Sequence, residues 1–249
     1  MKIPVQVKKV AHYPLSGFVK SIYQGLADTL LPSRCLLCGA AAGAHSLCAA
    51  CEGDLPRLPE AACPRCLRPT VGGCVCGACL KSPPAFDSLF ALFAYAFPAD
   101  RLILALKYRA QFGLADWLAQ RLGEALAGQL RQTDALVALP LHSKRLAERG
   151  FNQTHEIGKR LAAKSGLALL PQALRKIRAT PNQSRLPVKQ RQANLKGAFA
   201  ASADVAGLRL LLLDDVTTTG ATLHEAARTL KAAGALRVDA AVAARTLRD

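Results

Sequence analysis

Eight of the nine cysteines in this chain fall into two copies of one spacing, C-x2-C-x9-C-x2-C, displaced from each other by 28 residues. Each copy spans fewer than 20 residues, too few to bury a hydrophobic core, so a bound metal ion has to supply free energy for folding. Two C-x2-C knuckles present four thiolates to one tetrahedral ion, and we therefore expect two structural zinc ions. The first set of ligands is Cys35, Cys38, Cys48 and Cys51, and the second is Cys63, Cys66, Cys76 and Cys79.

Redox or other use of these thiols is the alternative to zinc. Four thiolates leave no open coordination position, so catalysis by the zinc ions is not expected. The N-terminal residues lack the apolar core of a secretory signal, and no run of about 18 apolar residues indicates a membrane span. We expect a cytoplasmic protein, in which structural disulfides are rare. Cys74 lies outside the repeat, and the sequence leaves open whether it replaces Cys76 as a ligand.

The chain divides into three expected parts. An apolar residue recurs every four positions between Phe18 and Leu30, which predicts a short amphipathic helix that packs on the zinc module, a partner or a membrane being the alternative. Pro83-Pro84 predicts a boundary. The expected parts are a tail and helix over residues 1–34, a double zinc ribbon over 35–82 and an α/β domain over 83–249.

After Phe86, apolar runs alternate with stretches of helical periodicity, which predicts a doubly wound, mainly parallel sheet that binds ligands at the carboxyl ends of its strands. Asn152 is a candidate N-cap, and Gly166 and Gly234 are candidate helix ends. The sequence does not reveal the strand order. We expect strands over 86–95, 135–140, 208–213 and 237–245, and helices over 101–130 (one or two), 152–166 and 220–235.

The stretch LRLLLLDDVTTTGATL (residues 208–223) combines a buried strand, two acids and a threonine-glycine turn before a helix. Unpaired N–H groups at a helix N-terminus favour a phosphate, and a glycine lets the backbone approach it closely. Asp214 and Asp215 would repel that phosphate but suit the hydroxyls of a ribose. The turn, expected over 214–222, therefore predicts a ribose 5-phosphate site, with hydroxyl donors from Thr218, Thr219 and Thr222. A Walker loop is excluded, since no Gly-Lys-Ser/Thr is present.

The positive charge of the chain is concentrated in one segment. The whole chain carries a formal charge of +16, and residues 142–196 hold thirteen Lys or Arg against Glu148 and Glu156, a net of +11. Such an excess favours a polyanion, either a phosphorylated small molecule or a nucleic-acid backbone, with solubility as the alternative. Aromatic residues are few in this segment, which limits base stacking and predicts mainly electrostatic binding.

Several segments resemble a known family. LLLLDDVTTTGAT is similar to the 5-phosphoribosyl-1-pyrophosphate (PRPP) binding motif of type I phosphoribosyltransferases. ALPLHSKRLAERGFNQT (138–154), RKIRATPNQSRLPVKQRQANLKGAF (175–199) and the double cysteine repeat preceded by LLPSRCLLCG resemble segments of the ComF/GntX family, in the same order. The resemblance begins at about Leu30 and implies a type I phosphoribosyltransferase fold behind a double zinc ribbon.

The resemblance also implies roles for particular residues. Asp214 and Asp215 would hold the ribose and stabilise positive charge at its C1 atom, and Mg²⁺ would bridge the diphosphate. Residues 140–149 would be the pyrophosphate loop, with His142 as either a surface residue or a further contact. Residues 176–196 would be a lid containing Gln183 and Arg185. The implied PRPP contacts are Val216, Thr217, Thr218, Thr219, Gly220, Ala221, Thr222, Lys144, Arg145, Arg149, Arg178 and Arg191.

Three functions follow as hypotheses from this resemblance. The first is a PRPP-binding protein that acts with single-stranded DNA in natural transformation or DNA use, together with competence or DNA-processing proteins. The second is an active phosphoribosyltransferase with an unknown acceptor, since no segment plainly supplies a hood for a base. The third is a PRPP-sensing scaffold without chemistry. Fold alone does not choose among them.

Overall fold

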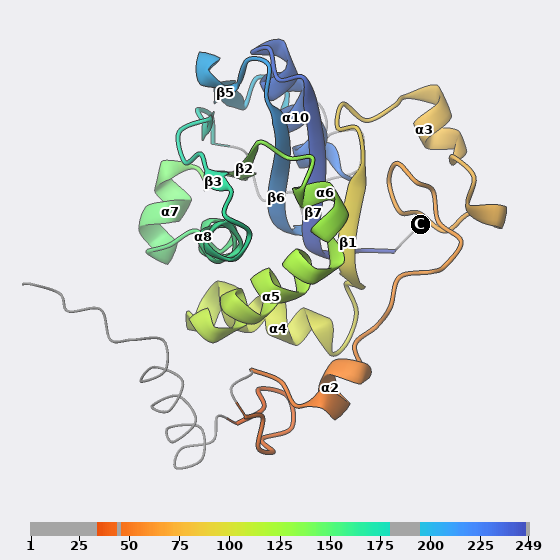
Figure 1. Cartoon of the computed structure of the whole chain (residues 1–249), viewed down its shortest axis with the longest axis vertical. Helices are drawn as coiled ribbons and strands as arrows, with labels where there is room; N and C mark the ends of the chain where they lie inside the picture. Colours follow the sequence, from red (N-terminus) through yellow and green to blue (C-terminus); the bar gives the residue numbers. More distant parts are fainter. Residues whose placement is uncertain (1–33, 44–45, 180–194, 248–249) are drawn as a thin grey trace, which may run out of the picture.

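The structure is a computed structural model that describes residues 34–43, 46–179 and 195–247. Strands and helices alternate from Leu89 onward (Figure 1). The strands are β1 (Leu89–Ala94), β2 (Ala135–Ala138), β3 (Ala168–Leu169), β4 (Leu174–Lys176), β5 (Phe199–Ala201), β6 (Arg209–Thr217) and β7 (Arg237–Arg245). The helices are α2 (Ala49–Gly53), η1 (Val71–Gly73), α3 (Gly77–Lys81), α4 (Ala99–Arg109), α5 (Phe112–Ala125), α6 (Ala127–Leu130), α7 (Ser143–Arg149), α8 (Gln153–Ser165), η3 (Ala203–Val205) and α10 (Ala221–Ala232).

Five strands form one parallel sheet in the order β1-β7-β6-β2-β3. The strand that is last in the sequence, β7, therefore lies between β1 and β6, a position that periodicity alone could not reveal. A separate antiparallel pair is formed by β4 and β5, and β5 contacts α10. The expected α/β fold with a parallel sheet is confirmed.

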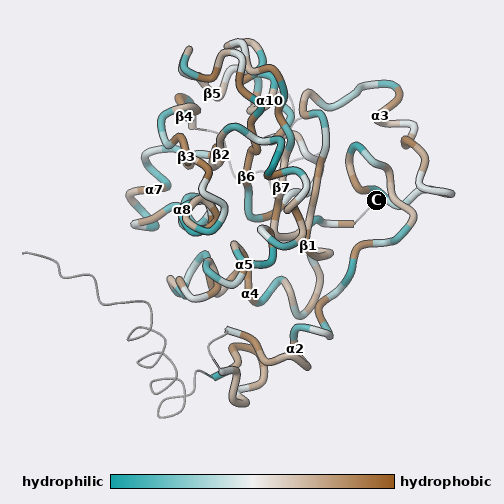
Figure 2. Tube along the Cα trace, in the orientation of Figure 1, coloured by the Kyte–Doolittle hydropathy of each residue, from teal (hydrophilic) through white to brown (hydrophobic). Residues whose placement is uncertain are grey.

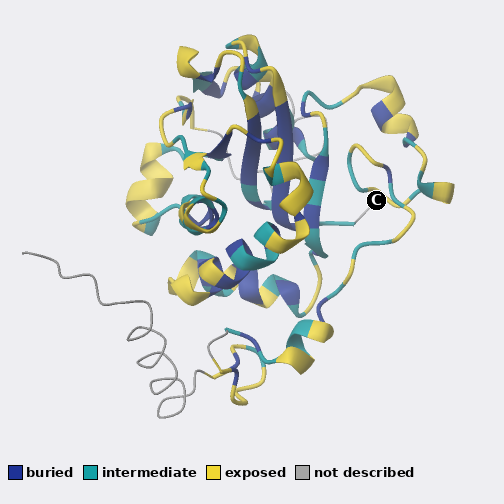
Figure 3. Cartoon of the chain, in the orientation of Figure 1, coloured by how far each residue is buried: buried dark blue, intermediate teal, exposed yellow. Residues whose placement is uncertain are grey.

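The sheet buries apolar side chains on both faces, as the uninterrupted apolar run of β6 predicts. Leu211 and Leu213 pack with α4, α5 and α8, whereas Leu210 and Leu212 pack with α10 on the opposite face. Figure 2 shows the apolar central strands, and Figure 3 shows them as the buried centre of the molecule. This alternation fixes the direction of each following side chain of β6.

Most of the expected elements are present, with two corrections of extent. The side chain of Asn152 accepts hydrogen bonds from the backbone of Thr154 and His155, and Gly166 ends α8 in the left-handed conformation, as predicted. The expected stretch 101–130 forms three helices rather than one or two. Strand β6 continues through Thr217, so the two acids belong to the strand and not to the turn after it.

The segment expected to be a pyrophosphate loop is mostly helical. Residues 143–149 form α7, and only residues 139–142 connect it to β2. The side chain of His142 is the N-cap of α7, where its Nδ1 atom accepts the backbone N–H of Lys144 at 3.3 Å. A basic helix thus replaces most of the expected loop at the carboxyl end of β2.

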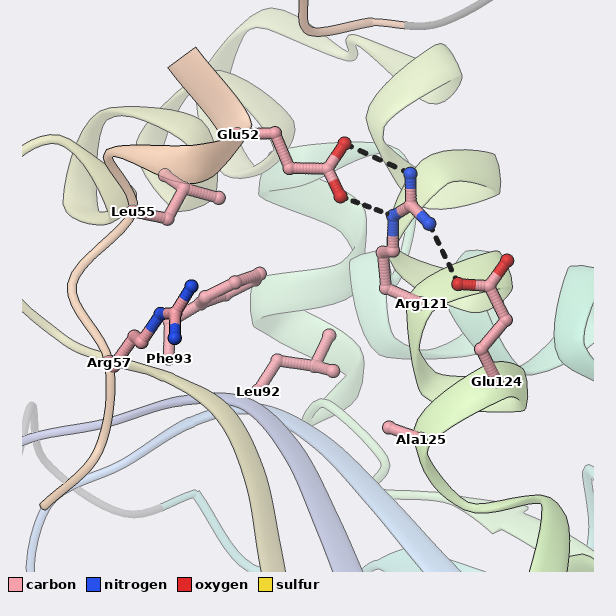
Figure 4. A pocket seen from close by; sticks show the side chains of 8 residues that line it. All are labelled: Glu52, Leu55, Arg57, Leu92, Phe93, Arg121, Glu124 and Ala125. Carbon is pink, nitrogen blue, oxygen red and sulfur yellow. Dashed lines mark hydrogen bonds and ion pairs between the residues drawn. The ribbon is translucent and has the colours of Figure 1, made fainter. Parts of the chain in front are cut away.

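The first cysteine module packs directly against α4 and α5. Its residues Leu47 and Leu55 share a buried cluster with both helices. Glu52 of α2 forms an ion pair with Arg121 of α5 at 2.7 Å, and Arg121 also binds Glu124 (Figure 4). The indole N–H of Trp117 donates to Glu52 at 3.3 Å. Helix α5 therefore holds the first module through both apolar and charged contacts.

The second cysteine module contacts the carboxyl end of β7. The buried guanidinium of Arg245 donates to the backbone carbonyl of Cys66 at 2.9 Å. The next residue, Thr246, donates its N–H to the carbonyl of Thr217 at 2.9 Å. The second module is thus bonded to the last residue of β7, and the residue after it is hydrogen-bonded to the last residue of β6.

Some expectations concern residues beyond those that the structure describes. The amphipathic helix predicted between Phe18 and Leu30 lies outside the described residues, as do Gln183, Arg185 and Arg191 of the expected lid. Among the helices within the described ranges, none is both long and apolar enough to cross a membrane.

Candidate functional site

Each cysteine quartet has its sulfur atoms arranged for one metal ion. The four Sγ atoms of each set lie within 4.8 Å of one another. The sulfurs of Cys38 and Cys48 are 3.8 Å apart, and those of Cys66 and Cys76 are 3.6 Å apart. Zn–S bonds of about 2.3 Å at tetrahedral angles require sulfur separations of about 3.8 Å. The eight predicted ligands therefore fit two zinc ions, and Cys74 is exposed and outside both quartets.

The backbone of the knuckles favours thiolates before any ion binds. Burial opposes ionisation of Cys35, but N–H groups of Cys48, Cys38 and Leu37 outweigh it and lower the pKa of this thiol to about 6. The equivalent residue Cys63 behaves alike: burial is outweighed by N–H groups that include that of Cys76, and its pKa falls to about 6. Zinc binds the thiolate form, so one cysteine of each module is already favoured as a thiolate before zinc binds.

The two adjacent acids of β6 occupy different environments. Asp215 has a side chain only 6% exposed, and its Oδ2 atom lies 2.9 Å from the Nζ atom of Lys107 in α4. The same oxygen accepts a hydrogen bond of 2.6 Å from Gln153 of α8. Burial opposes the charge of Lys107, but the Asp215 carboxylate outweighs this and raises the pKa of the amine. The carboxylate of Asp215 is therefore paired with a lysine and hydrogen-bonded to a glutamine of the same chain.

Asp214 is half-buried and has no such cation in direct contact among the described residues. Its Oδ1 atom accepts the N–H of Asp215 at 2.8 Å and lies 3.5 Å from the hydroxyl of Thr154. Burial, followed by the charge of Asp215, raises the pKa of the Asp214 carboxyl to about 7. Asp214 is thus the acid of the pair with unused acceptor capacity for a ligand.

The turn expected to bind a phosphate follows directly after these acids. Thr218 and Thr219 are exposed, and Gly220 adopts the left-handed conformation with a φ of 75°. The Oγ1 atom of Thr219 accepts the N–H of Ala221 at 3.3 Å, and the N-cap residue of α10, Gly220, has no side chain to cap the helix. The remaining predicted turn residues are Val216 and Thr222, both half-buried, and Thr217 and Ala221, both buried. A left-handed glycine thus leads directly into the N-terminus of α10.

The predicted basic residues that the structure describes lie on α7 and at the start of the expected lid. Lys144 and Arg145 are exposed on α7. Arg149 points back toward α8 and α4, where its Nη1 atom binds the amide oxygen of Gln153 at 2.6 Å and its guanidinium lies 5.4 Å from the ring centre of Tyr108. Arg178 donates to the carbonyl of Lys196 at 2.7 Å. Arg149 thus binds Gln153, the same residue that binds Asp215. Arg178 links the two ends of the expected lid, since Lys196 is its last residue.

Two lysines at the site were not singled out in the sequence. Lys107 interrupts the apolar stretch LILALKY of α4, and an isolated charge of this kind is a usable signal for a buried partner. Lys176 of β4 is half-buried, and its pKa is lowered by burial and then by Arg145, whereas Asp214 acts in the opposite direction. Lys176 therefore lies within electrostatic range of both an α7 arginine and the half-buried acid.

The histidine near the turn is structural. The Nδ1 atom of His224 accepts the backbone N–H of Ala85 at 3.0 Å, and this holds the linker after Pro84 against α10. Trp117 is 2% exposed and stacks on Phe93 with ring centres 5.8 Å apart. Both side chains therefore have packing or hydrogen-bond partners within the fold.

Comparison with known proteins matches both halves of the chain. Residues 26–80 match the double zinc ribbon domain, and residues 119–249 match the phosphoribosyl transferase domain. Among solved structures, the glutamine phosphoribosylpyrophosphate amidotransferase of B. subtilis is 18% identical with a TM-score of 0.38, covering 56% of this chain and 30% of that chain. The two cysteine quartets are accordingly the zinc-binding sites of a double zinc ribbon.

Curated relatives extend over most of the chain. The DNA utilization protein YhgH of Salmonella typhimurium is 34% identical over 225 residues, covering 87% of this chain and 99% of the relative. Competence protein F of Haemophilus influenzae is 30% identical over 209 residues, covering 75% of this chain and 91% of the relative. With a double zinc ribbon, a phosphoribosyl transferase domain and relatives of this similarity, the chain belongs to the ComF/GntX family.

Proposed function

We propose that this protein binds PRPP at the carboxyl end of β6 and acts with single-stranded DNA in DNA uptake or use. The PRPP part of this proposal rests on the order of the groups at the carboxyl end of β6. A half-buried acid with spare acceptor capacity, Asp214, is followed within six residues by a left-handed glycine, Gly220, and the N-terminus of α10. Acid and turn suit the two ends of a ribose 5-phosphate.

In this proposal the two acids have separate roles. Asp214 accepts the ribose hydroxyls, and Asp215 holds the site in shape through Lys107 and Gln153. The residues of the turn, 216–222, surround the 5-phosphate. Lys144, Arg145 and Arg149 of α7, with Arg178 and Arg191 of the expected lid, contact the diphosphate. Mg²⁺ arrives with PRPP and takes few protein ligands, as this ion usually does with phosphates.

The DNA part rests on charge and on the relatives. Residues 142–196 carry a net charge of +11, and two relatives are named a DNA utilization protein and a competence protein. A phosphate backbone is the polyanion that such a segment attracts most generally. A cytoplasmic location, in which zinc thiolates stay reduced, is part of the same proposal.

Transferase activity is the second candidate, because a carboxyl group, Asp214, and an amine, Lys176, lie within electrostatic range at the site. Displacement of pyrophosphate from C1 develops positive charge on the ribose and negative charge on the leaving group. The charge of Asp214 acts to raise the pKa of Lys176, and the two groups have the signs needed for these two charges. Release of pyrophosphate from PRPP, screened against bases, amines and single-stranded DNA, tests this candidate.

The PRPP site is tested by calorimetric titration of the full chain with PRPP and Mg²⁺. We expect Asp214→Ala to weaken binding about tenfold or more, as loss of a charge-assisted hydrogen bond does. The matched control is Asp204→Ala, which removes an exposed acid of η3. Zinc content stays near two ions per chain in both variants. Equal PRPP affinity in Asp214→Ala and the unsubstituted protein would refute the site.

A further inference from the structure

The exposed aromatic side chains of the described residues gather in one region. Three aromatic residues are exposed, namely Phe97 at 74%, Tyr108 at 70% and Phe112 at 39%, and all three lie at the ends of α4 or the start of α5. The sequence alone places them far from the basic segment, in which Phe151 is nearly the only aromatic residue. The fold brings them together, because Phe112 contacts Phe151 with ring centres 5.1 Å apart.

Arginines from the basic segment lie on these rings. The guanidinium of Arg149 is 5.4 Å from the ring centre of Tyr108, and that of Arg160 is 5.9 Å from the ring centre of Phe112. Tyr108 and Phe112 therefore lie against arginines of α7 and α8, respectively. Alternating rings and guanidinium groups are the usual components of a binding site for single-stranded nucleic acid.

A groove runs along α4. It has a volume of about 920 Å³ and lies between α4 and the first zinc ribbon, which pack against each other (Figure 1). Arg101 and Tyr108 line it from α4, at an interval of seven residues that places them on one helix face, and Phe97 lines it from the segment just before α4. Arg109 lines its far end, and the knuckle residue Leu36, 40% exposed, lines the opposite wall.

The charges around the groove favour an anionic strand along the α4 wall. Arg101, Arg109 and Arg149 face it or adjoin it, and Asp54 is the one acidic side chain in its lining. Cys38 and Cys51, two of the zinc-ligand residues, line the other wall. A strand would therefore place its phosphates toward the arginines of α4 and its bases against Phe97 and Tyr108.

We infer that this groove, called here the α4 groove, binds single-stranded DNA by stacking bases on Phe97 and Tyr108. The inference rests on the proposed action on single-stranded DNA and gives that action a place in the fold. It also changes the expected mode of binding, from a purely electrostatic contact along residues 142–196 to one with a stacking platform. The competing occupant is the amphipathic segment that the sequence predicts between Phe18 and Leu30.

The test measures fluorescence anisotropy of a labelled oligothymidylate of about 20 nucleotides, several times the site size of one stacking module. We expect Phe97→Ala with Tyr108→Ala to weaken binding about tenfold or more, because the bases lose the rings on which they stack. Phe97→Tyr with Tyr108→Trp keeps the rings and should retain affinity. The matched control, Leu236→Ala, removes an exposed apolar side chain at the start of β7 and should change nothing.

A second pair of variants tests the arginines. Arg101→Ala with Arg109→Ala should lower the slope of log affinity against log salt concentration by about 1.4, since each phosphate contact with a single strand contributes about 0.7. The matched control, Arg65→Ala with Arg68→Ala, removes two exposed arginines of the second ribbon. Equal loss of slope in the two pairs would overturn the assignment to the α4 groove.

The outcomes separate this inference from the proposed function. If the unsubstituted protein binds the oligonucleotide and the aromatic variant binds it equally well, the groove is not the site, while the proposed function stands. Competition by duplex DNA as strong as by the single strand also overturns the inference, because paired bases cannot stack on the rings. If the unsubstituted protein does not bind single-stranded DNA, the DNA part of the proposed function itself fails, whatever the PRPP titration shows.

Discussion

Adjacent acids in one strand differ here in their bonding partners. Asp215 reaches Lys107 and Gln153, on two helices that pack with Leu211 and Leu213. Asp214 accepts the backbone N–H of Asp215, lies 3.5 Å from the hydroxyl of Thr154 and keeps acceptor capacity. A pair of carboxylates that reads as equivalent in the sequence therefore consists of one bonded acid and one available acid.

Removal of the amine beside Asp215 should destabilise the fold strongly. We expect Lys107→Met to lower the free energy of unfolding by about 3 kcal/mol, because it leaves a buried carboxylate without its cation. Urea denaturation followed by circular dichroism measures this difference. The control is Lys164→Met, whose ion pair with Asp116 is exposed on both sides and should be worth at most about 1 kcal/mol. Similar losses in the two variants would show that Asp215 is not held as described.

The ionisation of Asp214 predicts a pH dependence of stability. Its pKa is about 7 in the folded protein and about 4 in an unfolded chain, so the folded state binds more protons between these values. Stability therefore falls as the pH rises from 5 to 7, by up to about 1.4 kcal/mol per pH unit from this group. Asp214→Asn should remove this slope, as measured by urea denaturation at pH 5, 6 and 7.

The matched acid for that experiment is Asp134. A hydrogen bond from the Arg209 side chain, and then one from its backbone, lower the pKa of Asp134 to about 2. Its stabilisation is lost only as the pH falls through the acidic range, so Asp134→Asn should leave the slope between pH 5 and 7 unchanged. A slope that persists in Asp214→Asn would place the titration elsewhere.

At the scale of elements, the junction from β6 to α10 depends on one glycine. A Cβ atom at Gly220 would lie 3.7 Å from the ring of Phe86, an ordinary contact, so the obstacle is the φ of 75° and not space. We expect Gly220→Ala to cost about 1–2 kcal/mol of stability and to weaken PRPP binding. Gly128→Ala in α6, where nothing lies within 4 Å, is the control and should be neutral or slightly stabilising. Unfolding curves and PRPP titration of both variants measure these effects.

Elements with local signals were predictable from the sequence. Asn152 and Gly166 delimit α8 because caps act within a few residues, and the apolar run of β6 marks a central strand. The strands β3, β4 and β5 have two or three residues each and leave no periodicity to detect. Helix α7 was expected to be a loop because the family resemblance outweighed its own helix-forming residues.

The site was only partly predictable for a related reason. The acids and the turn lie together in one segment, so their spacing reveals them. Lys107 and Lys176 reach the acids from elements that are distant in the sequence, and their positions depend on how the helices and β4 pack on the sheet. The contacts between aromatic residues and arginines were missed in the same way, since Tyr108 and Arg149 meet only in the folded protein.

At the scale of the whole molecule, the single tryptophan reports on the first zinc ribbon. Trp117 is 2% exposed beneath α2 and bonded to Glu52. Chelation of zinc should unfold this short module and expose the indole, with a red shift of its fluorescence, while the helical circular dichroism of the α/β domain persists. The same shift is expected from Cys48→Ser with Cys51→Ser.

The second module provides the contrast. Cys63→Ser with Cys66→Ser should remove one zinc ion per chain and leave the emission of Trp117 unchanged, since that module contacts β7 and not α5. Metal analysis and emission spectra of the two double variants decide the question. An identical shift in both would mean that the ribbons unfold as one unit.

The position of β7 has a consequence for the order of assembly. This strand joins β1 to the other three strands of the sheet, and it follows all of them along the chain. During translation, β1 therefore has no neighbour in this sheet to pair with until β7 leaves the ribosome. A nascent polypeptide halted before residue 237 would hold β1 apart from the other strands for as long as the halt lasts, which makes the synthesis of β7 the step that closes the sheet.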